Sequence, residues 1–167
     1  TYSGIIDKCF DLSINNETNL PDWILNMQGM SGKKYRIFIN HLIKNIKNPK
    51  YLEVGCWKGS TFCSAIFSNE IEAVGIDNWS EFGGPKTQFH QNLQNSLSNL
   101  NNEKIKIIED DYKNVILEKD KKYNIYFFDG PHQEEDHYQS LLKMCEYLDD
   151  EFIFICDDWN WDFVRSG

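Results

Sequence analysis

The chain has 167 residues, of which 41% are hydrophobic and 14% aromatic, enough apolar material for one globular domain with a buried core. It carries 26 acidic residues against 17 Lys and Arg, a formal net charge of -9, and no basic stripe, so a nucleic-acid partner is not expected. No apolar run approaches the roughly 18 residues of a membrane span and no leader of the secretory type is present, so we expect no membrane partner.

The cysteines indicate the redox compartment. They are odd in number and contain no C-x-x-C pair, which favours a reduced, cytoplasmic protein with buried thiols over a disulfide framework or a zinc site. The chain begins at Thr1 without a methionine and stops at Gly167 in what resembles the start of an element. We therefore expect a fragment of a longer protein.

Residues 1–33 are polar and rich in Asn, and they predict an N-terminal arm or a simple linker before the core. A helical turn is expected at 22–25 after Pro21, and the glycines of 29–32 predict a flexible break. Apolar residues from Tyr35 to Ile46 recur with helical spacing, and Asn48-Pro49 ends that helix. Residues 34–167 are the predicted core domain.

From residue 50 onward strands and helices alternate. Apolar runs predict strands near 50–55, 71–77, 104–109, 123–129 and 151–157, and helices near 60–68, 86–100, 112–119 and 134–148. Such alternation predicts an α/β fold with a doubly wound, mostly parallel open sheet, Rossmann-like, and apparently truncated after strand five. Ligands of such sheets bind beyond the carboxyl ends of the strands, where the strand order reverses.

A glycine turn follows the first strand, in the stretch Tyr51 to Ser60. Gly55 and Gly59 stand four apart, with Ser60 and Thr61 as the expected N-cap of the next helix. Glycine permits unusual dihedral angles and lets a ligand lie against the backbone. The spacing matches neither the G-x-G-x-x-G fingerprint of dinucleotide folds nor the Walker loop. A tight connection in any α/β protein is the plainer alternative.

A carboxylate follows the second strand, at Asp77, 22 residues after Gly55. A carboxylate in this place can accept both hydroxyls of a ribose. Together, E-V-G-x-x-x-G and I-D resemble motifs I and II of the class I S-adenosylmethionine (SAM) dependent methyltransferases. The resemblance implies that Glu53, Gly55, Gly59 and Asp77 bind SAM.

The resemblance also implies that the N-terminal arm, residues 1–33, could cover the cofactor or substrate. Two further segments are cofactor candidates. Asn78 and Trp79 open a loop in which Trp79 could stack on adenine, close over the substrate or tuck into the core. After the third strand, an acidic residue of the related methyltransferases accepts the adenine amino group. We assign that role to Asp111, with Asp110 as its competitor, and a solvated loop that caps the next helix is the alternative.

Three carboxylates follow the fourth and fifth strands, at Asp129, Asp157 and Asp158. Neighbouring strands lie about 4.8 Å apart, so these side chains should converge if the two strands are adjacent. Three carboxylates so close repel one another unless a cation neutralises them. A hard, oxygen-binding cation such as Mg²⁺ is the expected occupant.

The pattern D-G-x-H at one strand end and D-D at the next resembles the metal-dependent O-methyltransferases of the catechol and macrolide-sugar types. The resemblance implies that Asp129, Asp157 and Asp158 bind the metal and that His132 is the general base, a task suited to a neutral imidazole. Asp129 is also a catalytic and cofactor-binding candidate. The catechol type commonly has Asp-Asn where this chain has Asp-Asp. Each residue could instead be structural, capping a turn or facing solvent.

The sequence thus predicts a SAM-dependent methyltransferase that transfers a methyl group to a hydroxyl of a small molecule or sugar with Mg²⁺ assistance. One alternative is a Rossmann oxidoreductase of the NAD type, which the missing third glycine disfavours. Another is a non-catalytic SAM-binding or interaction module. A homo-oligomer is possible, and the small acceptor is not specified by any motif.

Overall fold

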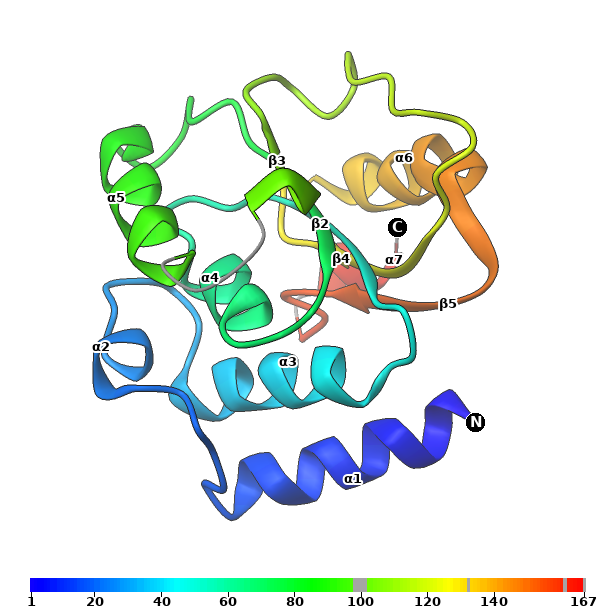
Figure 1. Ribbon diagram of the computed structural model, residues 1–167. Helices are drawn as coiled ribbons and strands as arrows, with labels where there is room; N and C mark the ends of the chain where they lie inside the picture. The colour runs from blue at the N-terminus through cyan, green and yellow to red at the C-terminus, as the bar shows by residue number, and fades with distance from the viewer. Residues whose placement is uncertain (98–101, 132, 161, 167) are drawn as a thin grey trace. The chain divides into compact units, whose positions relative to one another are not determined.

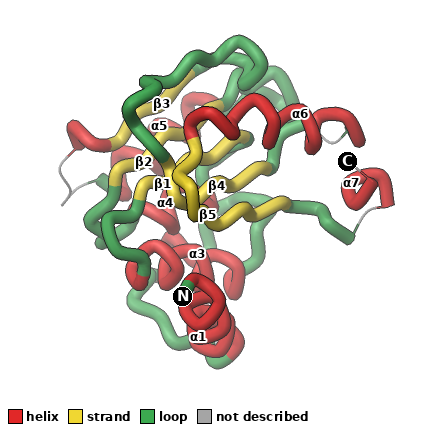
Figure 2. Tube along the Cα trace, turned by 90° about the vertical axis from the view of Figure 1, so that its right-hand side faces the viewer, coloured by secondary structure: helices red, strands yellow, loops and turns green. Residues whose placement is uncertain are grey.

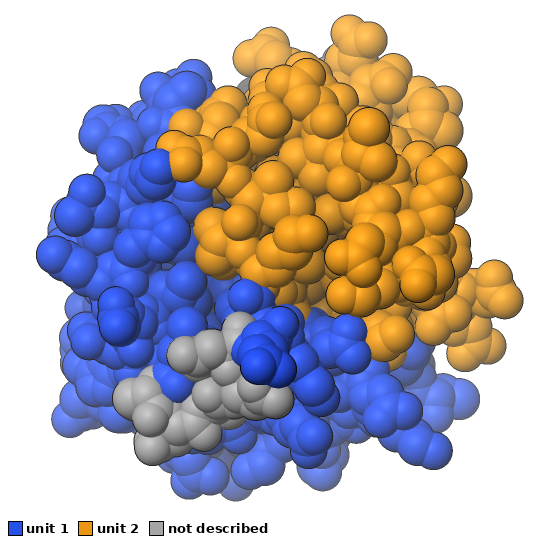
Figure 3. Space-filling view, turned by 45° about the horizontal axis from the view of Figure 1, so that its top comes forward, with its two compact units in different colours: residues 1–49, 56–72, 79–105 blue, residues 50–55, 73–78, 106–167 orange. Residues whose placement is uncertain are grey.

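The computed structural model describes residues 1–97, 102–131, 133–160 and 162–166. The chain divides into two compact units (Figure 3). The first contains residues 1–49, 56–72 and 79–105, and the second contains residues 50–55, 73–78 and 106–167. Among the described residues no helix combines the length and the apolar character needed to cross a bilayer.

The second unit is built on a five-stranded parallel sheet. Its strands are β1 (Lys50–Val54), β2 (Glu72–Ile76), β3 (Ile105–Ile108), β4 (Tyr123–Phe128) and β5 (Leu148–Cys156). Their order across the sheet is β3-β2-β1-β4-β5 (Figure 2), with β4 paired in parallel to both β1 and β5. All five predicted strands and the doubly wound topology are therefore confirmed, and the strand order reverses between β1 and β4.

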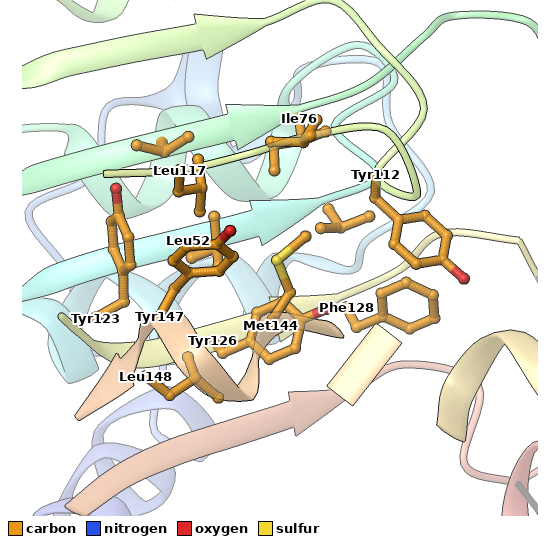
Figure 4. Close-up of a cluster of buried hydrophobic side chains, with 13 residues drawn as sticks. Leu52, Ile76, Tyr112, Leu117, Tyr123, Tyr126, Phe128, Met144, Tyr147 and Leu148 are labelled. Carbon is orange, nitrogen blue, oxygen red and sulfur yellow. The ribbon is translucent and has the colours of Figure 1, made fainter. Parts of the chain in front are cut away.

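The core of this unit lies on one face of the sheet. Every residue of β4 is buried, as expected for a central parallel strand covered on both sides. Alternate residues of β1 and β4 enter an apolar cluster (Figure 4) together with Met144 and Tyr147, which come from α6 (Glu134–Met144) and the 3₁₀ turn η2 (Cys145–Tyr147). Burying aromatic and aliphatic side chains of this size is the main stabilising contribution to the unit.

Helix α6 buries a different face from the apolar stripe in its sequence. Tyr138 and Leu142 are each 57% exposed, whereas His137, Ser140 and Met144 are buried. The buried polar groups are bonded within the helix, because Ser140 Oγ donates to the His137 carbonyl at 2.9 Å. Hydrogen bonding thus lets polar side chains occupy a face that hydropathy alone would place in solvent.

The helix predicted over 112–119 is absent from the structure, which has turns and extended chain there. Val115 and Leu117 enter the apolar cluster while Ile116 between them is 80% exposed. That alternation has the period of extended chain, not of a helix. The prediction was wrong because three consecutive apolar residues carry no periodicity of their own.

The first unit contains the helices α1 (Tyr2–Ile14), α2 (Asp22–Leu25), α3 (Lys33–Asn45), α4 (Ser60–Ile66) and α5 (Lys86–Ser96). The turn at 22–25 and the helix near 35–46 are confirmed. Helix α1, which was not predicted, lies alongside α3 (Figure 1), and the Phe10 and Phe38 rings stack with centroids 4.4 Å apart. The first unit also contains the 3₁₀ turn η1 (Asn102–Lys104), and the second unit ends with α7 (Asp162–Ser166).

Buried polar side chains hold the first unit together beside a small apolar cluster. The Arg36 guanidinium, 2% exposed, donates to the carbonyls of Ile24, Met27 and Ser31 at 2.7 to 2.8 Å. Burial lowers the pKa of this guanidinium from its usual value. Because its donors meet backbone carbonyls, Arg36 ties the segment between α2 and α3 to the helix that follows.

Candidate functional site

Residues one position beyond the strands of the second unit form a row along the carboxyl edge of the sheet. Asp77 N–H donates to the Ile108 carbonyl at 3.2 Å and Gly55 N–H to the Ile76 carbonyl at 2.9 Å. In the same way, Asp129 N–H donates to Val54 at 2.9 Å and Asp157 N–H to Phe128 at 3.1 Å. The row therefore runs Asp77, Gly55, Asp129, Asp157, and it contains one predicted site residue from each of four strands.

Gly55 is required by a close approach of the backbone. Its φ is +88°, and a Cβ at this position would lie 1.9 Å from the carbonyl oxygen of Asp129. The sequence predicted that glycine is needed here to leave room for a ligand, whereas the structure shows that it leaves room for the Asp129 backbone. The end of β4 occupies the space that a side chain would need, so the glycine lets β1 and β4 end side by side.

Gly59 belongs to the first unit, where it is the N-cap of α4 with a φ of +85°. Its N–H donates to the Cys56 carbonyl at 2.7 Å, which closes the turn. The prediction that Ser60 and Thr61 cap the helix was wrong, since both lie inside its first turn. A left-handed conformation just before the helix is open to glycine without strain.

Glu53, near the end of β1, is fully buried. Its Oε2 accepts a hydrogen bond of 2.5 Å from the Tyr51 hydroxyl on the same face of the strand. A protein group thus already satisfies this oxygen. Contact of Glu53 with a cofactor stays a prediction.

The remaining carboxylates predicted to contact the cofactor fall into two settings. Asp77 is half-buried at the edge of the sheet, and Asn78 after it is exposed. Asp110 and Asp111 are bonded locally, because Asp111 Oδ1 accepts the Lys113 N–H at 2.9 Å and Asp110 Oδ1 accepts the Asn114 amide at 3.0 Å. These bonds order the loop after β3 as an Asx turn, and each carboxylate keeps a second oxygen for a ligand.

Trp79 lies in the first unit and is buried there. Its ring meets Phe89 with centroids 5.1 Å apart, and its Nε1–H donates to the Trp57 carbonyl at 2.7 Å. Of the alternatives that the sequence left open, this environment matches packing in the core. Stacking on adenine stays a prediction.

Asp129, Asp157 and Asp158 come together as predicted from adjacency of β4 and β5. One oxygen of each carboxylate lies within 4.8 Å of the others, and all three side chains are half-buried. His132, predicted as the base, lies outside the described residues. Three hard oxygen donors at this spacing match the ligand preferences of Mg²⁺ or a similar divalent cation.

The conformation of Asp158 explains how two consecutive residues reach one cluster. In extended chain, successive side chains point to opposite faces, so Asp157 and Asp158 would diverge. Asp158 instead has a φ of +53°, in the left-handed region that Asp tolerates better than most residues. Leaving the strand geometry at this residue brings both carboxylates to the same place.

The negative charge of the cluster affects the pKa of Cys156, the last residue of β5. Burial and then the charges of Asp157, Asp129 and Asp158 raise the pKa of the Cys156 thiol to about 11. This thiol is therefore protonated at neutral pH. All five cysteines are free, three of them buried.

Comparison with known sequences identifies the family of the domain that carries these strand-end residues. A family profile described as a methyltransferase domain matches residues 52–159, from β1 to just beyond the carboxylate cluster. The chain belongs to this methyltransferase family. No curated protein sequence matches the chain.

Solved methyltransferases share the fold of this domain. A methyltransferase of Podospora anserina bound to S-adenosylhomocysteine (SAH) has a TM-score of 0.63 at 15% identity, over 92% of this chain and 61% of that one. An O-methyltransferase of Bacillus cereus in complex with SAH has a TM-score of 0.60 at 13% identity, over 92% and 65%. Coclaurine N-methyltransferase has a TM-score of 0.52 at 14% identity, over 93% and 51%. The chain thus spans less than two thirds of each protein.

Two residues with side-chain hydrogen bonds from or to the glycine turn, Trp57 and Asn92, were not predicted from the sequence. Trp57 lies within the turn, and Asn92 on α5 donates from Nδ2 to the Lys58 carbonyl at 2.8 Å. Asn92 is 34 residues from its partner in the chain. A side chain that bonds a backbone carbonyl leaves no pattern in the sequence, because every residue type offers that acceptor.

Proposed function

We propose that the domain transfers a methyl group from SAM to a hydroxyl group of a small molecule or sugar, with a divalent cation such as Mg²⁺ held by Asp129, Asp157 and Asp158. The observation that carries this proposal is the convergence of these carboxylates within 4.8 Å, in a chain that belongs to a methyltransferase family.

The cofactor part of the proposal rests on the row of strand-end residues. Asp77 would accept the two ribose hydroxyls, and Asp111 or Asp110 the adenine amino group. Both structures bound to SAH described above share this fold. Bound SAM would supply an electrophilic methyl group on its sulfonium. Asp129, the residue after β4, lies beside Gly55 at the end of β1, where its N–H donates to the Val54 carbonyl.

The acceptor part of the proposal rests on the charge of the cluster. A bound cation would lower the pKa of an acceptor hydroxyl and hold its oxygen in place. The three carboxylates would hold and orient that cation, and His132, the base that the family resemblance implies, would take up the hydroxyl proton. Trp159, directly after the cluster and 59% exposed, offers an aromatic wall to an acceptor.

The same fold serves other acceptors, as coclaurine N-methyltransferase illustrates. A hydroxyl is favoured here because a hard cation binds oxygen donors in preference to amines. A non-catalytic SAM-binding module is the second candidate. Three carboxylates crowded in one place argue against it, since a binding module has no use for their mutual repulsion.

Calorimetric titration of SAH into the protein, with and without Mg²⁺, tests the cofactor. Wild-type protein should bind SAH at micromolar concentration, and Asp77→Ala should weaken binding by about 10²-fold because a charged acceptor of two hydroxyls is lost. Asp120→Ala, an exposed carboxylate of the same unit, is the matched control and should bind as wild type does. Absence of SAH binding by the folded wild-type protein would refute the proposal.

A further inference from the structure

Two hydrogen bonds donated by indole rings, one from each loop, join two loops of the first unit. Trp79 Nε1–H donates to the Trp57 carbonyl at 2.7 Å, and Trp57 Nε1–H donates to the Phe82 carbonyl at 3.2 Å. Trp57 lies in the glycine turn, and Trp79 and Phe82 lie in the loop before α5. We call these two bonds the indole latch.

Asn92 adds a third bond to the turn, from Nδ2 to the Lys58 carbonyl at 2.8 Å, and its side chain is buried. The carbonyl of Cys56 accepts the Gly59 N–H at 2.7 Å. Three consecutive carbonyls of the turn, at residues 56 to 58, are therefore each bonded to a defined donor. Two of these donors are the side chains of Trp79 and Asn92.

Bonding a carbonyl also orients the amide that follows it. The peptide bonds of the described chain are not cis, and a trans peptide holds C=O and N–H on opposite sides of its plane. The bond from Trp79 to the Trp57 carbonyl thus turns the Lys58 N–H away from Trp79. Because Asn92 fixes the next peptide plane in the same way, the direction of the turn's amides depends on these two side chains.

The two loops joined by these bonds need such support because both contain residues in strained conformations. Trp57 has a φ of +45°, Trp79 of +50° and Phe82 of +49°, all in the left-handed region that disfavours large side chains. Residues in sparsely populated conformations persist only where their surroundings hold them, and they concentrate at ligand sites. Trp57→Gly would remove the strain at this residue, but it would also remove the hydrogen bond from the Trp57 indole to the Phe82 carbonyl.

We propose that Trp79 and Asn92 are positioning residues that hold the glycine turn in its cofactor-binding conformation before SAM arrives. This inference rests on the proposed function, since it assumes that the turn binds SAM. In this proposal Trp79 stabilises the turn through its hydrogen bond to the Trp57 carbonyl and does not stack on adenine. Preorganisation of this kind strengthens binding by removing the cost of ordering the loop.

Trp79→Phe and Asn92→Ala test the proposal, because each removes one donor to the turn and Trp79→Phe keeps an aromatic ring beside Phe89. Each should weaken SAH binding by about 5- to 10-fold, the effect of one buried hydrogen bond. The matched controls are Trp23→Phe on α2 and Gln91→Ala, next to Asn92 on α5, and both should bind SAH within about twofold of wild type. The double variant should lose less than the product of the single losses, since both donors act on one turn.

Amide hydrogen exchange of the free proteins separates positioning from general loss of stability. The Lys58 and Gly59 amides should exchange faster in Trp79→Phe and Asn92→Ala, while amides of the buried strand β4 keep their wild-type rates. Unchanged exchange in the turn, or unchanged SAH affinity in both variants, would overturn the inference. Failure of wild-type protein to bind SAH would instead refute the proposed function, and the exchange data would still decide whether the latch orders the turn.

Discussion

The end of β1 and the ends of β4 and β5, two parts of the row along the sheet edge, are organised in opposite ways. At the β1 end, Gly55 leaves out a side chain so that the Asp129 backbone can approach it. At the β4 and β5 end, three carboxylates lie within 4.8 Å of one another. The first arrangement is set by steric contact and the second by charge. Substitutions should therefore damage folding at the first end, and alter chemistry more than folding at the second.

The largest effect is expected at the steric end. Gly55→Ala should lower the free energy of unfolding by about 4 kcal/mol, because an alanine would be strained at this φ and its Cβ would overlap the Asp129 carbonyl. Gly83→Ala is a control for strain alone, since Gly83 has a φ of +84° with no atom within 4 Å of an added Cβ. It should lose about 1 kcal/mol. Equal losses in denaturant titrations of the two variants would contradict the steric explanation.

The next effect is expected on turnover at the charged end. His132→Ala should lower turnover by about 10²-fold, since a general base contributes at least that much, and it should leave SAH affinity unchanged. His41→Ala on α3 provides the control and should keep wild-type turnover. The comparison is made with initial rates at saturating SAM and calorimetric titration of SAH. Wild-type turnover of His132→Ala would remove the base assigned here.

The smallest effect is on stability at the charged end, and its sign is reversed. Asp158→Asn should raise the free energy of unfolding by about 0.5 to 1 kcal/mol in metal-free buffer, because it relieves repulsion within the cluster. Mg²⁺ should raise the melting temperature of wild-type protein, because an ion that binds only the folded state stabilises that state. The same Mg²⁺ concentration should have little effect on this variant, because one charged ligand has been lost.

Asp120→Asn, an exposed carboxylate outside the cluster, should change neither quantity. A loss of stability in metal-free Asp158→Asn would mean that the carboxylates are held by hydrogen bonds that outweigh their repulsion. A wild-type melting temperature that does not respond to Mg²⁺ would count against the cation.

Together these variants compare how a sterically required glycine and a cluster of carboxylates affect the free energy of unfolding. A steric requirement is satisfied in the folded chain whether or not a ligand is bound. A cluster of like charges would be destabilising without a bound cation, so the proposed function predicts that these carboxylates serve the reaction and not the stability of the fold. The indole latch of the first unit belongs to the first kind, since it holds strained residues through bonds within the chain.

The sequence by itself determined the alternation of strands and helices, because apolar runs and turn residues are local properties of the chain. It also determined which residues follow each strand. In a parallel sheet that is enough to predict that Gly55, Asp77, Asp129 and Asp157 share one edge. The family resemblance added the expected roles of these residues.

Only the tertiary structure decided how the side chains are used. The backbone contact that requires Gly55 and the burial of Trp79 depend on partners distant in the chain, and no residue pattern marks the left-handed turn at Asp158. The loop at 112–119, predicted as a helix, takes an extended form in which Val115 and Leu117 enter the apolar cluster, and the burial of His137 and Ser140 on α6 likewise depends on the tertiary fold. Packing and hydrogen bonding across the fold override local propensity, and neither is written in the spacing of residues along one segment.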